Sequence, residues 1–312
     1  MKVYRGLHEV PEDFGPSVVT IGVFDGVHRG HQALMHTVVD LGRTHEAVPT
    51  VATFDRHPLE VIAPDKAPQL LSTLPQRARL IEQLGMEALV VMTFDDVFRH
   101  LSPEEFVRTV LVDELRCVHT VVGANFTFGH KRAGTIETLQ ALGAEHGFEV
   151  TVFEMQTGAV EDVVSSTLIR RHLADGDVDR ANAEMDHPYR LEGFVEKGAA
   201  RGKGLGFPTA NLRIPDRMLL PKLGVYVARV LRRGAGEPLP AVVNVGVNPT
   251  FEQRTDPVVE VHVLDFDEDL YGEVLEVEFL HRLRDEQRFP DADALVAQMD
   301  RDVADARAWF AG

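Results

Sequence analysis

Two histidines, His28 and His31, stand three residues apart in a glycine-containing turn. Residues 18–23 before the turn are mostly β-branched and predict a buried strand, and residues 33–41 after it have apolar side chains at helical spacing. A helix that opens here would point N–H groups and a partial positive charge at the turn, which suits a phosphate whose oxygens accept from the histidines. The alternative is a glycine-rich turn with two incidental histidines. The turn residues that we expect around the phosphate are Gly22, Phe24, Asp25, Gly26 and Gly30.

Three further polar segments follow predicted strands or open a predicted helix. Residues 53–58 read TFDRHP, and residues 122–134 read VGANFTFGHKRAG, whose amide, aromatic and basic side chains suit a ring and a phosphate. Residues 165–170, SSTLIR, predict a helix start with hydroxyl caps. Because ligands bind beyond the carboxyl ends of parallel strands, we expect these segments to form one site with the histidine turn. Ordinary surface loops and plain N-capping are the alternatives.

The sequence GVFDGVHRGH resembles the motif of the HxGH nucleotidyltransferase superfamily. The three polar segments, in this order, resemble the FMN adenylyltransferase module of bacterial FAD synthetases, over about the first 185 residues. The resemblance implies transfer of an adenylyl group from ATP to FMN with release of pyrophosphate. The ATP site that it implies contains His28, His31, Asn125, Ser166, Thr167 and Arg170. The flavin contacts that it implies are Phe54, His57, Pro58 and Phe128.

Two residues depart from this family's pattern. Arg56 replaces the first proline of a segment that more usually reads TFDPHP. Val163 stands where a basic residue is common, two positions before Ser165. These departures favour an alternative in which the first module has weak or no adenylyltransferase activity.

A second glycine-rich segment, residues 198–212, reads GAARGKGLGFPTANL. Its backbone N–H groups could nest phosphates, although the chain has no P-loop sequence. Thr209 and Asn211 offer neutral oxygens of the kind that Mg²⁺ accepts. A glycine-rich surface turn is the alternative. The residues expected to hold phosphate are Gly198, Arg201, Gly202, Lys203 and Gly204.

This segment resembles the riboflavin kinase signature GxxRGxxLGFPTANL, and the resemblance runs to the end of the chain. Residues 243–251, 259–264 and 269–272 resemble the family's NxGxxPTF, VExHxLDF and DxYG segments. The resemblance implies that Glu260 is the general base that takes the proton of a ribityl hydroxyl of riboflavin. Without the family, Glu260 would be interpreted as a solvent-facing strand carboxylate.

The elements that must position these residues alternate between strand and helix in the first half. This alternation indicates a parallel sheet covered on both faces, with Ser102 as the N-cap of one helix. The strands that we expect are 48–54, 88–94, 118–123 and 148–153. The later helices that we expect are 75–84, one opening at 102–105, and 135–146.

From residue 189 only short strand patterns follow, as in a small antiparallel barrel, before a terminal helix at 290–310. The predicted fold is α/β plus β. A Rossmann-like nucleotidyltransferase domain spans residues 1–186, and a riboflavin kinase barrel spans residues 187–312. The barrel strands that we expect are 191–195, 224–231, 239–245, 258–264 and 274–280.

The composition is that of a globular protein, with 44% hydrophobic and 26% charged residues among 312. The 49 acidic and 32 basic residues give a net charge of −17, so nucleic acid and membranes are poor partners and small molecules are the expected ones. The single cysteine, Cys117, lies beside an apolar run and is expected in the core. The sequence has no signal peptide or membrane-spanning run, which predicts a cytoplasmic protein and leaves a homo-oligomer open.

The two resemblances together imply one pathway, from riboflavin to FMN and from FMN to FAD, with ATP as co-substrate and Mg²⁺ as cofactor in both steps. The expected protein is therefore a bifunctional FAD-forming enzyme. Two alternatives stay open: a riboflavin kinase with a weak or inactive adenylyltransferase module, and a flavin-binding regulator without turnover. The presence of Glu260 argues against the regulator, because binding alone does not need a base.

Overall fold

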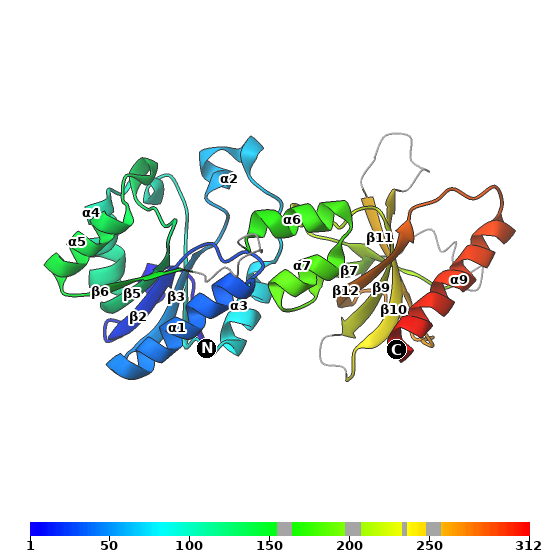
Figure 1. Ribbon diagram of the computed structural model, residues 1–312, viewed down its shortest axis with the longest axis horizontal. Helices are drawn as coiled ribbons and strands as arrows, with labels where there is room; N and C mark the ends of the chain where they lie inside the picture. The colour runs from blue at the N-terminus through cyan, green and yellow to red at the C-terminus, as the bar shows by residue number, and fades with distance from the viewer. Residues whose placement is uncertain (155–163, 197–206, 233–235, 248–256) are drawn as a thin grey trace. The chain divides into compact units, whose positions relative to one another are not determined.

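The computed structural model describes residues 1–154, 164–196, 207–232, 236–247 and 257–312 (Figure 1). By their contacts, the residues divide into two compact units. The first unit contains Met1–Pro68 and Thr73–Ser165, and the second contains Gln69–Ser72 and Ser166–Gly312. A parallel sheet forms the first unit, and a closed barrel forms the second.

The sheet of the first unit has six parallel strands in the order β1-β4-β3-β2-β5-β6. The strands are β1 (Lys2–Tyr4), β2 (Ser17–Ile21), β3 (Val48–Phe54), β4 (Ala88–Met92), β5 (Cys117–Gly123) and β6 (Glu149–Phe153). From β2 the chain builds β3 and β4 on one side, and then β5 and β6 on the other. In open α/β sheets, ligands bind at the carboxyl ends of the strands where the strand order changes direction in this way.

Helices cover both faces of this sheet (Figure 1). Met35 and Val38 of α1 and Ile81 of α3 are buried against one face, while Leu111 of η4 and Leu139 of α5 are buried against the other. The helices are η1 (Leu7–Glu9), α1 (Arg29–His45), α2 (Leu59–Ile62), η2 (Pro64–Lys66), α3 (Leu74–Gln83), η3 (Phe98–His100), α4 (Pro103–Phe106), the π-helix η4 (Val107–Glu114), η5 (His130–Arg132) and α5 (Ile136–His146). The burial of both faces explains why the sheet strands are almost continuously apolar.

The barrel of the second unit has six antiparallel strands in the order β10-β11-β8-β7-β12-β9. The strands are β7 (Tyr189–Glu196), β8 (Ala210–Arg213), β9 (Gly224–Arg232), β10 (Leu239–Val247), β11 (Pro257–Val263) and β12 (Val274–Asp285). Side chains alternate along each strand. On β11, Val259, Val261 and Val263 are buried, while Glu260 and His262 lie partly exposed on the other face.

Three helices pack with the barrel: α6 (Ser166–Asp175), α7 (Val178–Met185) and α9 (Ala292–Ala311). Asn182 of α7 donates to the Phe279 carbonyl oxygen (2.8 Å) and accepts from the Tyr189 backbone N–H (2.7 Å), which joins α7 to two strands. Ala306 of α9 is buried against Val225. Of the helices in the described ranges, none is long and apolar enough to cross a membrane.

The fold class predicted from the sequence is confirmed. The structure adds β1 and β8, which the sequence patterns did not predict. By their contacts α6 and α7 belong to the second unit, although both precede the predicted division at residue 186. Cys117 is buried in the core, as expected.

Candidate active sites

The turn after β2 has a strained backbone. Phe24, Gly26 and Val27 have positive φ angles of 52°, 79° and 40°, and the left-handed region is costly for a β-branched residue such as Val27. The Val27 N–H donates to the Phe24 carbonyl oxygen (3.1 Å), and the Gln32 amide donates to the Val27 carbonyl oxygen (2.9 Å). Helix α1 begins after its N-cap, His28, without an acidic residue in its first turn. This helix start suits an anionic ligand.

His28 and His31 stack on each other at this helix start. Their ring centroids are 3.6 Å apart with planes 19° from parallel, and the Phe24 ring meets His31 edge-on at 5.1 Å. The buried Nδ1 of His31 has no hydrogen-bond partner among the described residues. Burial, reinforced by the charges of His28 and Arg77, lowers the pKa of His31 well below 6.5. The imidazole of His31 is therefore neutral. The negative charge of an incoming phosphate would favour its protonated form.

Arg77 of α3 is a buried cation at the same turn, only 3% exposed. Its Nη1 donates to the Val23 carbonyl oxygen (2.5 Å) and reaches Thr53 Oγ1 (3.5 Å). Burial lowers the pKa of Arg77, and the nearby carboxylates of Asp25 and Glu60 oppose that shift. The sequence analysis missed Arg77, because an arginine in an amphipathic helix is normally interpreted as facing solvent.

The segment after β3 lies beside β2 in the sheet order. Asp55 accepts a hydrogen bond from the Phe94 backbone N–H (3.0 Å) and forms an ion pair with Arg56 (3.1 Å). The hydrogen bond to Asp55 raises the pKa of Arg56. His57 and Pro58 precede α2, with Pro58 as its N-cap. Arg56, which replaces the family's usual proline, is thus held by its own neighbour.

The two phenylalanines expected at the flavin lie in the core of the first unit. The ring of Phe54 meets Phe94 edge-on with centroids 5.3 Å apart, and Phe128 packs against Phe106 at 5.5 Å. Asn125, in contrast, is exposed in the loop after β5, which is the other neighbour of β2. The contacts of these residues with a flavin or ATP stay predictions.

Ser166, Thr167 and Arg170 lie together near the start of α6. Arg170 Nε donates to the carbonyl oxygen of Gln69 (2.7 Å), and both residues belong to the second unit. The histidine turn belongs to the first unit. A contribution of these three residues to the ATP site therefore stays a prediction.

In the barrel, Glu260 is the middle member of a row of three polar side chains. The strands pair so that Glu260 of β11 is opposite Asn211 of β8 on one side and Asn244 of β10 on the other. Directly opposite residues share one face of a sheet, so the row presents a carboxylate between two amides. Asn244 was not among the expected site residues, although its signal lay in the kinase-like segment 243–251.

A cavity of about 360 Å³ lies against this row. Thr209, Asn244 and Glu260 contribute polar atoms from the barrel side. The apolar residues that line it from α9 are Leu295, Met299 and Val303. The volume and the mixed lining are those of a small-molecule site.

An ion pair in the lining of this cavity joins α9 to β12. Arg284 binds Asp302 through two contacts, Nε to Oδ1 at 2.8 Å and Nη2 to Oδ2 at 2.7 Å. Asp302 is 4% exposed and also accepts from the Gln298 amide (2.8 Å). The position of the apolar wall therefore depends on this pair.

Several residues expected from the sequence lie outside the described residues, and their roles stay predictions. They are Val163, Gly198, Arg201, Gly202, Lys203 and Gly204.

Models of two protein families match the chain. Residues 10–168 match the family described as FAD synthetase, and residues 185–310 match the family described as riboflavin kinase. The first match contains the histidine turn, and the second contains Glu260 and its row. Together the two matches span more than half of the chain. Each match covers most of one of the two domains predicted from the sequence.

Curated relatives match nearly the whole chain. The bifunctional riboflavin kinase/FMN adenylyltransferase of Pseudomonas fluorescens is 40% identical over 314 residues, or 99% of this chain and 97% of its own. The enzyme of the same name from Escherichia coli (strain K12) is 39% identical over 315 residues, or 99% of this chain and 98% of its own. That of Bacillus subtilis (strain 168) is 36% identical over 307 residues, or 97% of this chain and 95% of its own. A crystal structure of a macrolide-efflux protein from Streptococcus pneumoniae superposes with a TM-score of 0.86 at 32% identity, covering 99% of this chain and 100% of that chain.

The first unit has a histidine pair after β2, the strand at which the sheet order changes direction. The second unit has a carboxylate beside a ligand-sized cavity. These two sites define a two-part transferase that acts on phosphates. The matches give the particular family. The chain belongs to the family of bifunctional riboflavin kinases/FMN adenylyltransferases. The family predicted from the sequence is confirmed.

Proposed function

We propose that the chain makes FMN from riboflavin in the second unit and FAD from FMN in the first, with one ATP consumed in each step. The observation that carries this proposal is that each unit holds its own reactive group in a suitable place. The first has the His28–His31 stack at the carboxyl end of its switch strand. The second has Glu260 in the wall of a cavity of about 360 Å³.

In the kinase step, Glu260 takes the proton of the ribityl hydroxyl, whose oxygen bonds to the γ-phosphorus of ATP as the bond to ADP breaks. The apolar wall from α9 holds the flavin ring and excludes water. Thr209 and Asn211 would hold Mg²⁺, because neutral oxygens beside a carboxylate are a donor set that suits this ion. When bound there, Mg²⁺ supplies positive charge to the transferred phosphate.

In the adenylyl transfer, a phosphate oxygen of FMN bonds to the α-phosphorus of ATP, and pyrophosphate leaves. No protein nucleophile is needed. His28 and His31 donate to phosphate oxygens where negative charge develops, together with the N–H groups that open α1. Arg77 acts as a positioning residue, since it holds the Val23 carbonyl and adds a buried positive charge.

The remaining sequence predictions belong to this proposal. The acidic surface supports small-molecule partners over nucleic acid or membranes, and we infer a cytoplasmic location. The proposed division of the two modules at residue 186 lies next to the start of the riboflavin kinase match at residue 185. The further ATP and phosphate contacts in the proposal are Asn125, Ser166, Thr167, Arg170, Gly198, Arg201, Gly202, Lys203 and Gly204.

Chromatographic separation of flavins, after incubation of the full chain with riboflavin, ATP and Mg²⁺, tests this function. We expect FMN to appear first and FAD to follow. Accumulation of FMN without FAD would favour the alternative in which the first module is inactive, for which Arg56 and Val163 are the candidate causes. Unchanged riboflavin would contradict the kinase assignment.

A further inference from the structure

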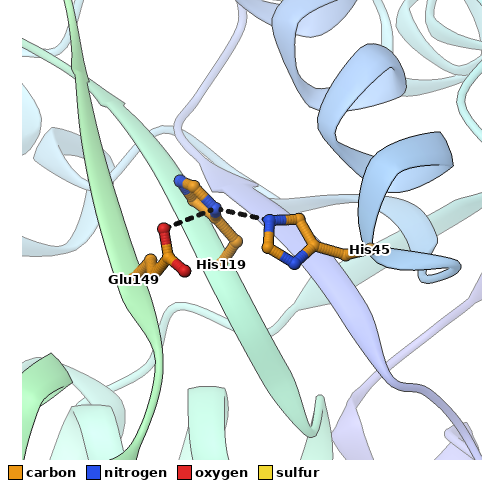
Figure 2. Close-up of side chains that lie close together, drawn as sticks. All are labelled: His45, His119 and Glu149. Carbon is orange, nitrogen blue, oxygen red and sulfur yellow. Dashed lines mark hydrogen bonds and ion pairs between the residues drawn. The ribbon is translucent and has the colours of Figure 1, made fainter.

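Three side chains that can ligate a metal meet in the first unit, at the end of α1 opposite the histidine turn (Figure 2). They are His45, the last residue of α1, His119 of β5 and Glu149, the first residue of β6. Helix α1 has 17 residues, so about 25 Å separates its two ends. The cluster is therefore distinct from the residues assigned to adenylyl transfer.

The spacing of the ligand atoms fits a small tetrahedral ion. His119 Nδ1 lies 3.1 Å from His45 Nε2 and 3.8 Å from Glu149 Oε2, and the three ligand atoms all lie within 4.8 Å of one another. Two ligands about 2.0–2.1 Å from a tetrahedral zinc ion lie about 3.3 Å apart. The side chain of Glu149 is 72% exposed, which leaves it free to close the longer distance.

A hydrogen bond orients His119 for this role. Its Nε2 lies 2.8 Å from Thr151 Oγ1. When the proton is on Nε2 and is donated to Thr151, the lone pair of Nδ1 faces His45 and Glu149, as Figure 2 shows for that nitrogen. Metal-ligating histidines are commonly fixed by such a bond from their other nitrogen.

The charges around the cluster also favour a cation. The carboxylate of Glu149 lies 3.8 Å from Nδ1 of His119 and brings a negative charge to the cluster. His45 lies in the last turn of α1, where the negative end of the helix dipole attracts positive charge. The thiol of the neighbouring Cys117 is buried and donates to the carbonyl oxygen of His119 (3.2 Å), and it is not a member of the cluster.

We propose that His45, His119 and Glu149 bind a divalent transition-metal ion such as Zn²⁺, with water completing its coordination. Two imidazoles and a carboxylate suit Zn²⁺, whereas Mg²⁺ prefers oxygen ligands alone. The ion ties the C-terminal end of α1 to β5 and β6, and so fixes the helix whose other end carries His28.

Equilibrium dialysis of the full chain against micromolar Zn²⁺ tests the site. Because His28 and His31 are also able to bind zinc, the number of bound ions is compared between variants. We expect the wild-type chain to bind one ion more than His45→Ala or Glu149→Gln. The control is His36→Ala, which removes an exposed histidine from the same helix and is expected to bind as the wild type does.

The bond to Thr151 gives a second test, with a spectroscopic signal. We expect Thr151→Val to weaken zinc binding about 10–100-fold, and Thr151→Ser, which keeps the hydroxyl, to restore it. Cobalt added to the wild type should give the visible absorption of a tetrahedral site, and His45→Ala should lose it. Equal binding by His45→Ala and His36→Ala, or no additional ion in the wild type, would overturn the proposal.

Discussion

Arg77, on helix α3, donates a hydrogen bond to the carbonyl oxygen of Val23, which lies 54 residues earlier in the chain and opens the turn that carries His28 and His31. An arginine side chain is rarely as buried as that of Arg77, because removing the guanidinium charge from water is costly. The bond supports a turn whose backbone has positive φ angles at Phe24 and Val27, one and four residues after Val23. Arg77 therefore links the packing of α3 to the geometry of the histidine turn.

Replacing Arg77 tests that link. We expect Arg77→Lys, which keeps the charge and loses the paired donors, to lower FAD formation about 10-fold or more while FMN formation is unchanged. Arg79→Met removes an exposed arginine from the same helix and serves as the control. The ratio of the two flavin products is the measurement. An equal fall in both products would show that Arg77 acts on stability alone.

The two reactions should separate by mutation. We expect His28→Asn to reduce FAD formation from FMN by about 10²–10³-fold and to spare FMN formation, because only the adenylyl transfer in the first unit loses its imidazole donor to phosphate. Glu260→Gln, which keeps the shape of the side chain, should reduce FMN formation by about 10²–10⁴-fold and spare FAD formation from added FMN. Rates measured with each flavin supplied separately distinguish the two. A variant that lost both activities while folded would contradict the two-site proposal.

The lowered pKa of His31 makes stability depend on pH. Below about pH 6.5 the unfolded chain binds a proton on this residue that the folded protein excludes, so the free energy of unfolding falls as the pH drops below that value. The slope contributed by one such group is at most about 1.4 kcal/mol per pH unit. His119 contributes in the same direction. Urea unfolding between neutral and mildly acidic pH should therefore show a shallower pH dependence in His31→Gln than in the wild type, and an unchanged dependence would contradict the assignment.

The ion pair between Arg284 and Asp302 should hold α9 on the barrel. Removal of one partner leaves a buried charge unpaired, so we expect Asp302→Leu and Arg284→Met each to destabilise the barrel by about 3 kcal/mol. The double variant Arg284→Met/Asp302→Leu should recover most of that loss. Trp309, the single tryptophan, lies on α9 and reports its unfolding by fluorescence. Additive losses in the double variant would show that the two residues act independently.

The sequence predicted most elements because their signals are local. Residues 48–54 form β3 with the bounds expected from their apolar run. Ser102 opens α4 in a capping box with Glu105, through reciprocal bonds of 3.1 and 2.8 Å. Such patterns involve only a few neighbouring residues, so they can be recognised in the sequence without knowledge of the tertiary structure.

What the sequence could not predict depends on tertiary contacts. Strand β8 has only four residues and contains Asn211, so its conformation comes from pairing with β7 and β11. Phe128 was expected at the flavin, and only the fold shows that its ring packs in the core of the first unit, while its contact with a flavin stays a prediction. Arg77 has no distinguishing neighbour in the sequence, because its partners Val23 and Thr53 come from other elements.

The left-handed backbone at Val27 has a consequence for engineering this enzyme for heat resistance. Glycine at this position would relieve a conformation that costs a branched residue on the order of 1 kcal/mol. It would also remove a fully buried core side chain that contributes about 1.5–3 kcal/mol, so libraries screened for survival at high temperature should reject Val27→Gly. The same change would loosen the turn just before His28 and blunt its alignment with a nucleotide. Stabilising libraries should therefore leave Val27 unchanged, since its side chain fills the core while its backbone sets the turn before His28.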